Sequence, residues 1–318
     1  MTPSDKIHIV FACDDNYAQH AGVAIASLKE QQISGLPVHV HLLDGGISPV
    51  NLQRLFQLKD ERLDITVYKG NIEEYSRYLV LQHFSTAMYL RLSVEKMLPQ
   101  EISRILYCDC DVIFLKPIDA LWNLDLQGHF LAAVEEGWNN APNNWRPDLG
   151  IDEPGRYFNS GVLLIDLNLW RSHQICEKVK DFIRSNWNTL RYPDQDGLNA
   201  VLSKKYLAIE KSWNFFSCTI GRKKTLTPHI VHFASEFKPW FYKSVDPFQE
   251  DYIKFLLRSS WKDYQFPDKN AFNTIKRKFL LFAPAFLVEG ITFFTFALRR
   301  FMHYCARQIA LFWIERKH

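Results

Sequence analysis

Residues 105–115, ILYCDCDVIFL, decide how this chain folds, because they place two carboxylates one residue apart inside an apolar run. The apolar residues on both sides are typical of a buried strand. A buried carboxylate without a partner is costly, so Asp109 and Asp111 need a cation or the mouth of a ligand site. Because side chains alternate along a strand, these two acids are predicted to point the same way and Cys110 the opposite way.

Segments typical of strands and helices alternate over the first 115 residues. The expected strands are residues 6–14, 37–44, 63–70 and 104–115, and the expected helices are residues 21–32, 49–58 (opened by Ser48) and 86–99. This alternation predicts an α/β fold with a mostly parallel sheet covered by helices. Ligands of such sheets bind beyond the carboxyl ends of the strands. The first and fourth expected strands end there with acidic pairs, Asp14–Asp15 and Asp109 with Asp111.

Beyond about residue 118 the alternation breaks. Residues 139–158 are rich in Asn, Pro and Gly and predict a long loop, which in a compact domain is usually functional or disordered. Three further segments follow, predicted as a strand at 160–170, a helix at 192–203 capped by an Asp, and, within 229–240, a strand followed by a Pro and aromatic loop.

The composition limits the functional classes. The chain has 318 residues, of which 47% are hydrophobic, so it can form a sizeable core. A net charge of only +3 predicts no strong field for polyanions, and nucleic acid is not an expected partner.

The first residues lack a basic segment followed by a long apolar run, which predicts no signal peptide, a cytosolic location and reduced, mostly buried cysteines. A zinc site at Cys108 and Cys110 is disfavoured, because no matching second pair exists.

Two carboxylates at a strand end suit a hard divalent cation. They can hold Mg²⁺ or Mn²⁺ and leave positions open for phosphate oxygens, and a nearby imidazole would favour Mn²⁺. Taken alone, the same motif also fits a solvated turn, and His232 alone also fits a structural histidine.

Five segments read together resemble a known family. They are FACDDNY (11–17), YCDCDVIF (107–114), YFNSGVLLIDLNLWR (157–171), YPDQDGLNAVL (192–202) and HFASEFKPW (232–240). In this order and spacing they are similar to the retaining glycosyltransferases of family 8, and most similar to bacterial lipooligosaccharide and lipopolysaccharide α-galactosyl- and α-glucosyltransferases. The resemblance covers roughly residues 6–261. It implies a GT-A fold, the Rossmann-like nucleotide-diphospho-sugar transferase fold.

The resemblance also implies roles for individual residues. It implies that Mn²⁺, or Mg²⁺, is held by Asp109, Asp111 and His232, and that Lys238 contacts phosphate. It places uridine on Ala12, Asp14, Asn16 and Tyr17, with Tyr17 stacked on the base. It assigns the donor sugar to Arg91, Asn159 and Asp194, with Gln195 beneath the anomeric carbon, so that Gln195 and Asp194 form the catalytic pair.

The residue types agree with these roles but fit plainer ones too. Tyr17 could also be an ordinary packing residue, and Lys238 could be a solvated lysine. Asn159 could also be a turn residue, and Asp194 or Asp196 could cap a helix. Two positions depart from the family pattern, which often has Gly at Ser235 and Asp at Glu136. Both departures bear on specificity more than on chemistry.

The implied activity is transfer of galactose or glucose from UDP-galactose or UDP-glucose to a hydroxyl of a lipopolysaccharide core oligosaccharide, with retention of configuration. An amide is a poor nucleophile, so Gln195 favours attack on the front face over a covalent intermediate. The alternatives are the same chemistry on another glycan or a protein acceptor, including a self-glucosylating glycogen primer, a nucleotide-sugar hydrolase, and a non-catalytic sugar-binding protein.

The chain is expected to divide into a catalytic domain, residues 1–268, and a basic amphipathic helical tail, residues 269–318. From Ala271 onward there are eight Lys and Arg against two acids. Phe279–Leu298 is long enough to span a bilayer, but Pro284, Glu289 and Gly290 count against a span. The tail is therefore predicted to lie on the anionic inner face of a bacterial cytoplasmic membrane, near a lipid-linked acceptor. A true span and a helical cover on the catalytic domain are the alternatives.

Overall fold

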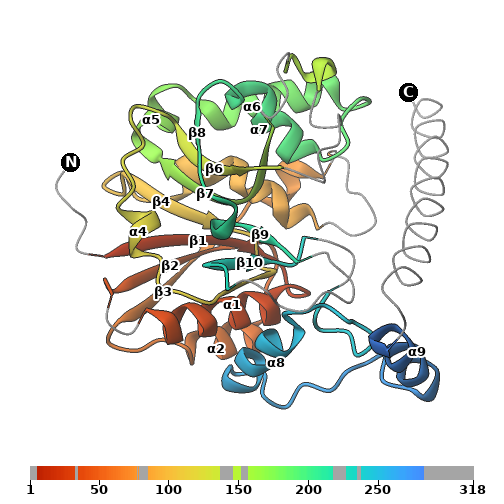
Figure 1. The fold of residues 1–318 in the computed structure, drawn as a ribbon. Helices are drawn as coiled ribbons and strands as arrows, with labels where there is room; N and C mark the ends of the chain where they lie inside the picture. Colours follow the sequence, from red (N-terminus) through yellow and green to blue (C-terminus); the bar gives the residue numbers. More distant parts are fainter. Residues whose placement is uncertain are drawn as a thin grey trace.

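A computed structural model describes residues 6–32, 35–76, 78, 85–136, 146–151, 157–217, 227–234 and 238–282 (Figure 1). The membrane prediction for residues 283–318, the departure at Ser235 and most of the predicted loop at 139–158 lie outside these ranges. Within them, no helix combines the length and the apolar character that crossing a membrane requires.

A seven-stranded sheet forms the centre of the molecule, in the order β3-β2-β1-β4-β7-β6-β8. Only β7 runs antiparallel to its neighbours, and the other adjacent pairs are parallel. This confirms the predicted mostly parallel sheet. The strands are β1 Ile7–Cys13, β2 Val38–Asp44, β3 Leu63–Lys69, β4 Arg104–Cys108, β6 Leu131–Glu135, β7 Phe158–Asp166 and β8 Tyr206–Ala208.

The predicted single strand at 104–115 is wrong, because the chain changes sheets within it. β4 ends at Cys108, and β5, Val112–Phe114, joins β9, Phe215–Phe216, and β10, Ile230–His232, in a second sheet of three strands. At the crossing, Asp109 N donates to Gly161 O at 2.8 Å and Phe233 N donates to Asp111 O at 2.9 Å. Residues 109–111, which connect the two sheets and are called the acidic passage below, are thus held by a backbone hydrogen bond at each end.

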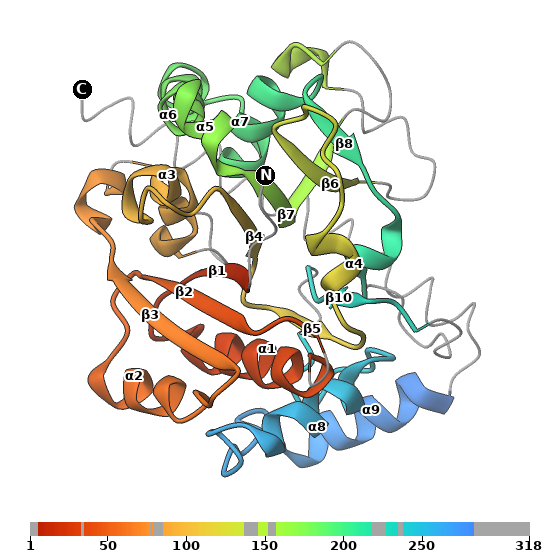
Figure 2. The same cartoon turned by 90° about the vertical axis from the view of Figure 1, so that its left-hand side faces the viewer.

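Helices cover both faces of the large sheet (Figures 1 and 2). On one face lie α1 Ala18–Gln31, α2 Pro49–Phe56 and α8 Gln249–Arg258, and on the other α5 Leu167–Ser172, α6 Ile175–Asn186 and α7 Pro193–Leu202. Side chains of β1 alternate between the two faces of the sheet and contribute to two hydrophobic cores. Ile9 and Phe11 pack in the core on one face and Val10 in the core on the other. The remaining helices are η1 Ile72–Tyr75, η2 Thr86–Ser93, α3 Val94–Met97, α4 Asp119–Trp122, η4 Pro147–Leu149, η5 Lys211–Trp213 and α9 Ala271–Phe282.

Local predictions met mixed outcomes. Ser48 caps α2 as expected, because its side chain accepts from Asn51 N. The helix predicted at 86–99 is instead the 3₁₀ helix η2 followed by one turn of α-helix. The expected Asp cap of α7 is wrong, since Tyr192 occupies the cap position and its side chain makes no capping hydrogen bond to the helix. Asp196 reaches back from inside the helix and accepts from the backbone N–H groups of Arg191 (2.6 Å) and Tyr192 (3.1 Å).

The cysteines of the described ranges agree with the sequence-based expectation. Cys13, Cys108, Cys110 and Cys176 are all buried and free of disulfides. Burial raises the pKa of the Cys108 thiol well above its usual range, so it is kept protonated. These residues therefore act as small apolar core groups.

Candidate metal centre and donor site

Three potential metal ligands converge where the two sheets meet. Asp109 follows β4, Asp111 precedes β5 and His232 ends β10, directly opposite Val112 in the antiparallel pairing with β5. His232 Nε2 lies 3.3 Å from Asp111 Oδ1 and 3.8 Å from Asp109 Oδ2. The structure therefore brings together three residues separated by up to 123 positions in the sequence, with one ligand atom of each within 4.8 Å of the others.

Two cations hold the carboxylate oxygens that face away from His232. Arg91 Nη2 donates to Asp109 Oδ1 at 2.6 Å, and Lys238 Nζ donates to Asp111 Oδ2 at 2.6 Å. Although burial opposes its ionisation, the positive charge of Lys238 holds the pKa of Asp111 well below its usual range. One oxygen of each carboxylate is thus left facing an imidazole nitrogen, a mixed O and N donor set that suits Mn²⁺.

Arg91 is the buried centre of the charge network. Besides Asp109, its guanidinium contacts Asp194, with Nε 3.2 Å from Asp194 Oδ2, and Nη1 donates to Ser160 Oγ at 2.9 Å. The guanidinium carbon lies 4.6 Å from the centroid of the Tyr107 ring. Burial raises the pKa of Asp194, and Arg91 opposes that shift. Arg91 was assigned to the donor sugar by resemblance, and the structure shows it engaged by two carboxylates.

Gln195 is fixed in one orientation by its neighbours. Its Oε1 accepts from Ser160 N at 2.9 Å and Asn159 Nδ2 at 3.1 Å. Its Nε2 donates to Glu136 Oε2 at 2.6 Å and Tyr157 OH at 3.1 Å. Because a backbone N–H can only donate, the amide oxygen must be the atom that faces Ser160. Glu136, singled out as a departure from the family pattern, therefore holds Gln195 directly.

The four residues assigned to uridine lie at the carboxyl end of β1, beside β4. Ala12 O accepts from Cys110 Sγ at 3.4 Å, which ties this strand end to the acidic passage. Asp14 Oδ1 accepts from Tyr17 N at 3.1 Å, and Asn16 is exposed. Burial raises the pKa of Tyr17, as does the charge of Asp111, which reflects how near the Tyr17 ring is to the acids. The end of β1 and Tyr17 thus lie next to the acids that precede β5.

Sequence reasoning missed several partners of these side chains. Ser160 and Tyr157 stand inside the quoted segment 157–171, so a search of the neighbours of Asn159 could have found them. Asn214, whose Oδ1 lies 2.9 Å from His232 Nδ1, falls outside every quoted segment. Only the folded chain brings it to the site.

Removing the buried charge at position 91 tests the network. Arg91→Met would leave Asp109 and Asp194 uncompensated, and breaking a buried ion pair this way typically costs about 3–5 kcal/mol. The control Lys96→Met removes an exposed partner of Glu177 and should cost less than about 1 kcal/mol. Urea unfolding gives both free energies. Equal stability of the two variants would show that Arg91 does not neutralise these acids.

Comparisons with known proteins show the family to which this chain is similar. The family model described as Glycosyl transferase family 8 matches residues 8–244. General stress protein A of Bacillus subtilis is 31% identical over 286 residues, which cover 82% of this chain and 96% of that protein. Lipopolysaccharide 1,2-glucosyltransferase of Escherichia coli is 27% identical over 293 residues, 87% of this chain and 85% of that protein.

A solved structure shows the same fold. The galactosyltransferase LgtC in complex with donor and acceptor sugar analogues superposes with a TM-score of 0.73 at 25% identity, covering 80% of this chain and 96% of LgtC. The large mostly parallel sheet therefore has the GT-A arrangement of LgtC. The matched family model spans both the acidic passage and His232, and the chain belongs to glycosyltransferase family 8.

Proposed function

We propose that this chain is a metal-dependent retaining hexosyltransferase that moves galactose or glucose from a UDP-sugar to a hydroxyl of a lipopolysaccharide core oligosaccharide. The observation that carries the proposal is the convergence of Asp109, Asp111 and His232 in a family 8 chain. The names of two relatives support the acceptor, a lipopolysaccharide 1,2-glucosyltransferase and a lipopolysaccharide 1,3-galactosyltransferase.

Asp109, Asp111 and His232 would hold the divalent cation, Mn²⁺ in preference to Mg²⁺ because of the imidazole. When bound, the ion supplies positive charge where negative charge develops on the leaving diphosphate. Lys238 would add a second cation to the same phosphates. Its Nζ stands at the site already, bonded to Asp111 Oδ2 and, at 2.7 Å, to Phe233 O.

The nucleotide and sugar would occupy the surfaces on either side of the acids. We assign the uridine to Ala12, Asp14, Asn16 and Tyr17, at the carboxyl end of β1. The donor sugar would lie against Arg91, Asn159 and Asp194. Since the guanidinium of Arg91 is shared between two carboxylates, its main contribution is to hold Asp109 and Asp194 in place.

Gln195 would stabilise the transition state without bonding to the sugar. Its carbonyl oxygen already accepts from Ser160 N and Asn159 Nδ2, which makes a poor nucleophile poorer still. We therefore infer attack on the front face. The bond from the anomeric carbon to the phosphate oxygen breaks, the acceptor oxygen bonds to that carbon from the same side, and the departing phosphate oxygen takes the acceptor's proton.

The substrate assignment is tested with a panel of UDP-hexoses and truncated lipopolysaccharide cores, with and without Mn²⁺, by following UDP and the glycan product. Transfer should require an acceptor, should be abolished by excess chelator, and should yield an α-linked product from an α-donor. UDP release at the same rate without acceptor would favour the hydrolase. Transfer that is unchanged in chelator would contradict the metal-dependent mechanism.

Replacement of Gln195 separates the two retaining mechanisms. Gln195→Ala should lower kcat by about 100- to 1000-fold, the typical effect of losing one electrostatic stabiliser, and leave measurable transfer. Gln195→Glu should do no better, because it sets a second carboxylate against Glu136. A Gln195→Ala protein that binds UDP normally but shows no transfer, together with an active Gln195→Glu protein, would instead indicate a covalent intermediate.

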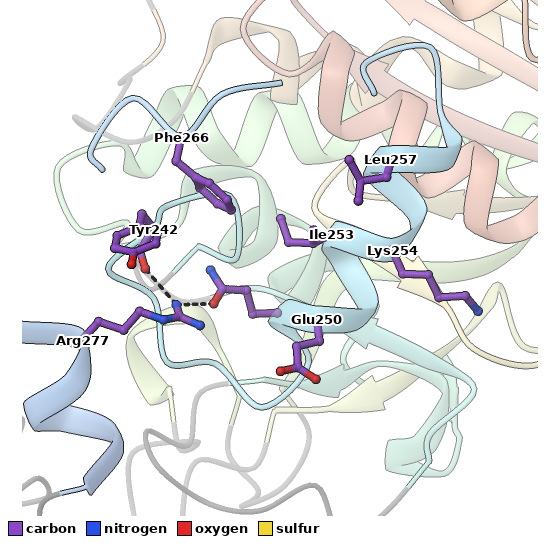
Figure 3. Close-up of a pocket in the computed structure, with 8 residues that line it drawn as sticks. Tyr242, Glu250, Ile253, Lys254, Leu257, Phe266 and Arg277 are labelled. Atoms are coloured by element: carbon purple, nitrogen blue, oxygen red, sulfur yellow. Dashed lines mark hydrogen bonds between the residues drawn. The ribbon is translucent and has the colours of Figure 1, made fainter. Parts of the chain in front are cut away.

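We also propose the division at residue 268, with a tail that docks on the anionic inner face of the bacterial cytoplasmic membrane. The first helix of the tail, α9, is anchored to the catalytic domain. Arg277 Nη1 donates to Tyr242 O at 2.8 Å and to Gln249 Oε1 at 2.5 Å, as Figure 3 shows. The anchor borders a cavity of about 360 Å³ lined by residues of α8, Tyr242, Phe266 and Arg277.

The outer face of α9 supports contact with lipid. Phe272 and Ile275 are 73% and 70% exposed, and the sequence of the helix also carries Lys276 and Lys278 on either side of the anchoring Arg277. Exposed apolar side chains beside cations are the pattern of a helix lying on an anionic membrane surface. A peripheral site of this kind would bring the active site to a lipid-linked acceptor.

The membrane proposal is tested by sedimentation with vesicles of anionic phospholipid. Phe272→Ser/Ile275→Ser should weaken co-sedimentation, and truncation after Phe282, which spares the Arg277 anchor, should weaken it further. Val50→Ser serves as the control, because Val50 is a 64% exposed apolar residue on the distant helix α2. Co-sedimentation of all variants at the wild-type level would contradict the proposed tail.

A further inference from the structure

A chain of buried amides links His232 to Gln195. It begins at a backbone group, because Gly161 N donates to Asn159 Oδ1 at 2.8 Å. That N–H can only donate, so the oxygen of Asn159 must face it. Asn214 Nδ2 donates to the same oxygen at 2.8 Å, and Asn159 Nδ2 donates to Gln195 Oε1 at 3.1 Å. The orientation of Asn159 is thereby settled by the main chain.

The orientation of Asn159 fixes that of Asn214 and then the tautomer of His232. Because Nδ2 of Asn214 donates to Asn159 Oδ1, the other amide atom, Oδ1, is the one that lies 2.9 Å from His232 Nδ1. An amide oxygen can only accept, so Nδ1 carries a proton. In the neutral ring, Nε2 then presents its lone pair toward Asp109 and Asp111, which is the form in which imidazole binds a metal.

Close packing holds the ring in the same position. A Cβ added to Gly161 would stand 2.2 Å from His232 Cε1 and 2.7 Å from His232 Nδ1, so the ring lies directly against the backbone there. Asn214 and His232 are 1% and 3% exposed, so water does not compete for the bond between them. The hydrogen bond to Asn214 therefore determines whether Nδ1 of His232 carries the ring proton.

We propose that Asn214 is a positioning residue, which holds His232 in the tautomer that a divalent cation requires and joins it through Asn159 to Gln195. The inference rests on the proposed metal-dependent function and extends it to a residue that, within the described part of the chain, makes no hydrogen bond to Asp109, Asp111 or Gln195. Outer-shell partners of this kind typically change metal affinity by about 10- to 100-fold.

The test measures Mn²⁺ affinity by calorimetry on the whole chain without donor, and the ring ¹⁵N spectrum of His232 in the metal-free protein. Asn214→Ala should bind Mn²⁺ about 10- to 100-fold more weakly and show a mixture of ring tautomers. Asn214→Asp, which keeps an acceptor for Nδ1–H, should recover part of the affinity. Ser212→Ala is the matched control, since Ser212 Oγ lies 3.3 Å from Nδ1 of His229, three residues before His232.

Wild-type Mn²⁺ affinity in Asn214→Ala, or a wild-type ring spectrum in that variant, would overturn the proposal. If Asn214→Ala does not fold, the same two measurements are made on Asn214→Asp. Wild-type Mn²⁺ affinity together with a His232 ring protonated at Nε2 in Asn214→Asp would likewise overturn the proposal. Failure of the wild-type protein to bind Mn²⁺ would refute the proposed function, and the ring spectra would still decide whether Asn214 fixes the tautomer.

Discussion

The site depends on how three neighbouring carboxylates, two buried and one partly buried, are kept together. Asp109, Asp111 and Asp194 would repel one another in a water-poor setting unless cations compensated them. Arg91 bridges Asp109 and Asp194, and Lys238 bonds to the outer oxygen of Asp111. These ion pairs leave one oxygen each of Asp109 and Asp111 facing His232. The folded chain thus neutralises most of the charge itself and leaves three donor atoms, within 4.8 Å of one another, whose types match a divalent cation.

The fold follows from the same constraint. A continuous strand through residues 104–115 would place two acids in the middle of a sheet, whereas the observed chain leaves one sheet at Cys108 and enters another at Val112. The second sheet brings His232 beside the acids through the pairing of β10 with β5. The proposed metal site is therefore located at a junction of two sheets, where backbone bonds from both sides hold Asp109 and Asp111.

Much of this arrangement could be predicted from the sequence. The alternation of segments typical of strands and helices predicted a mostly parallel sheet, and the acids at strand ends indicated where the candidate metal ligands meet. The change of sheet at Cys108 could not be predicted, because it depends on pairing with β10, more than 100 residues later. The same holds for the roles of Arg91 and Asn214, whose partners meet them only in the folded chain. The cap of α7 was mispredicted because Asp196 bonds backward from within the helix, a geometry that composition does not reveal.

The central claim is that a cation gripped by Asp109, Asp111 and His232 recognises the diphosphate of the donor. The most direct measurement is the affinity for UDP with and without Mn²⁺, in the wild-type protein and in Asp111→Asn. We predict that Mn²⁺ tightens UDP binding by at least about tenfold, a coupling of about 1.4 kcal/mol, and that this coupling disappears in Asp111→Asn. Equal UDP affinity with and without Mn²⁺ in the wild-type protein would contradict it.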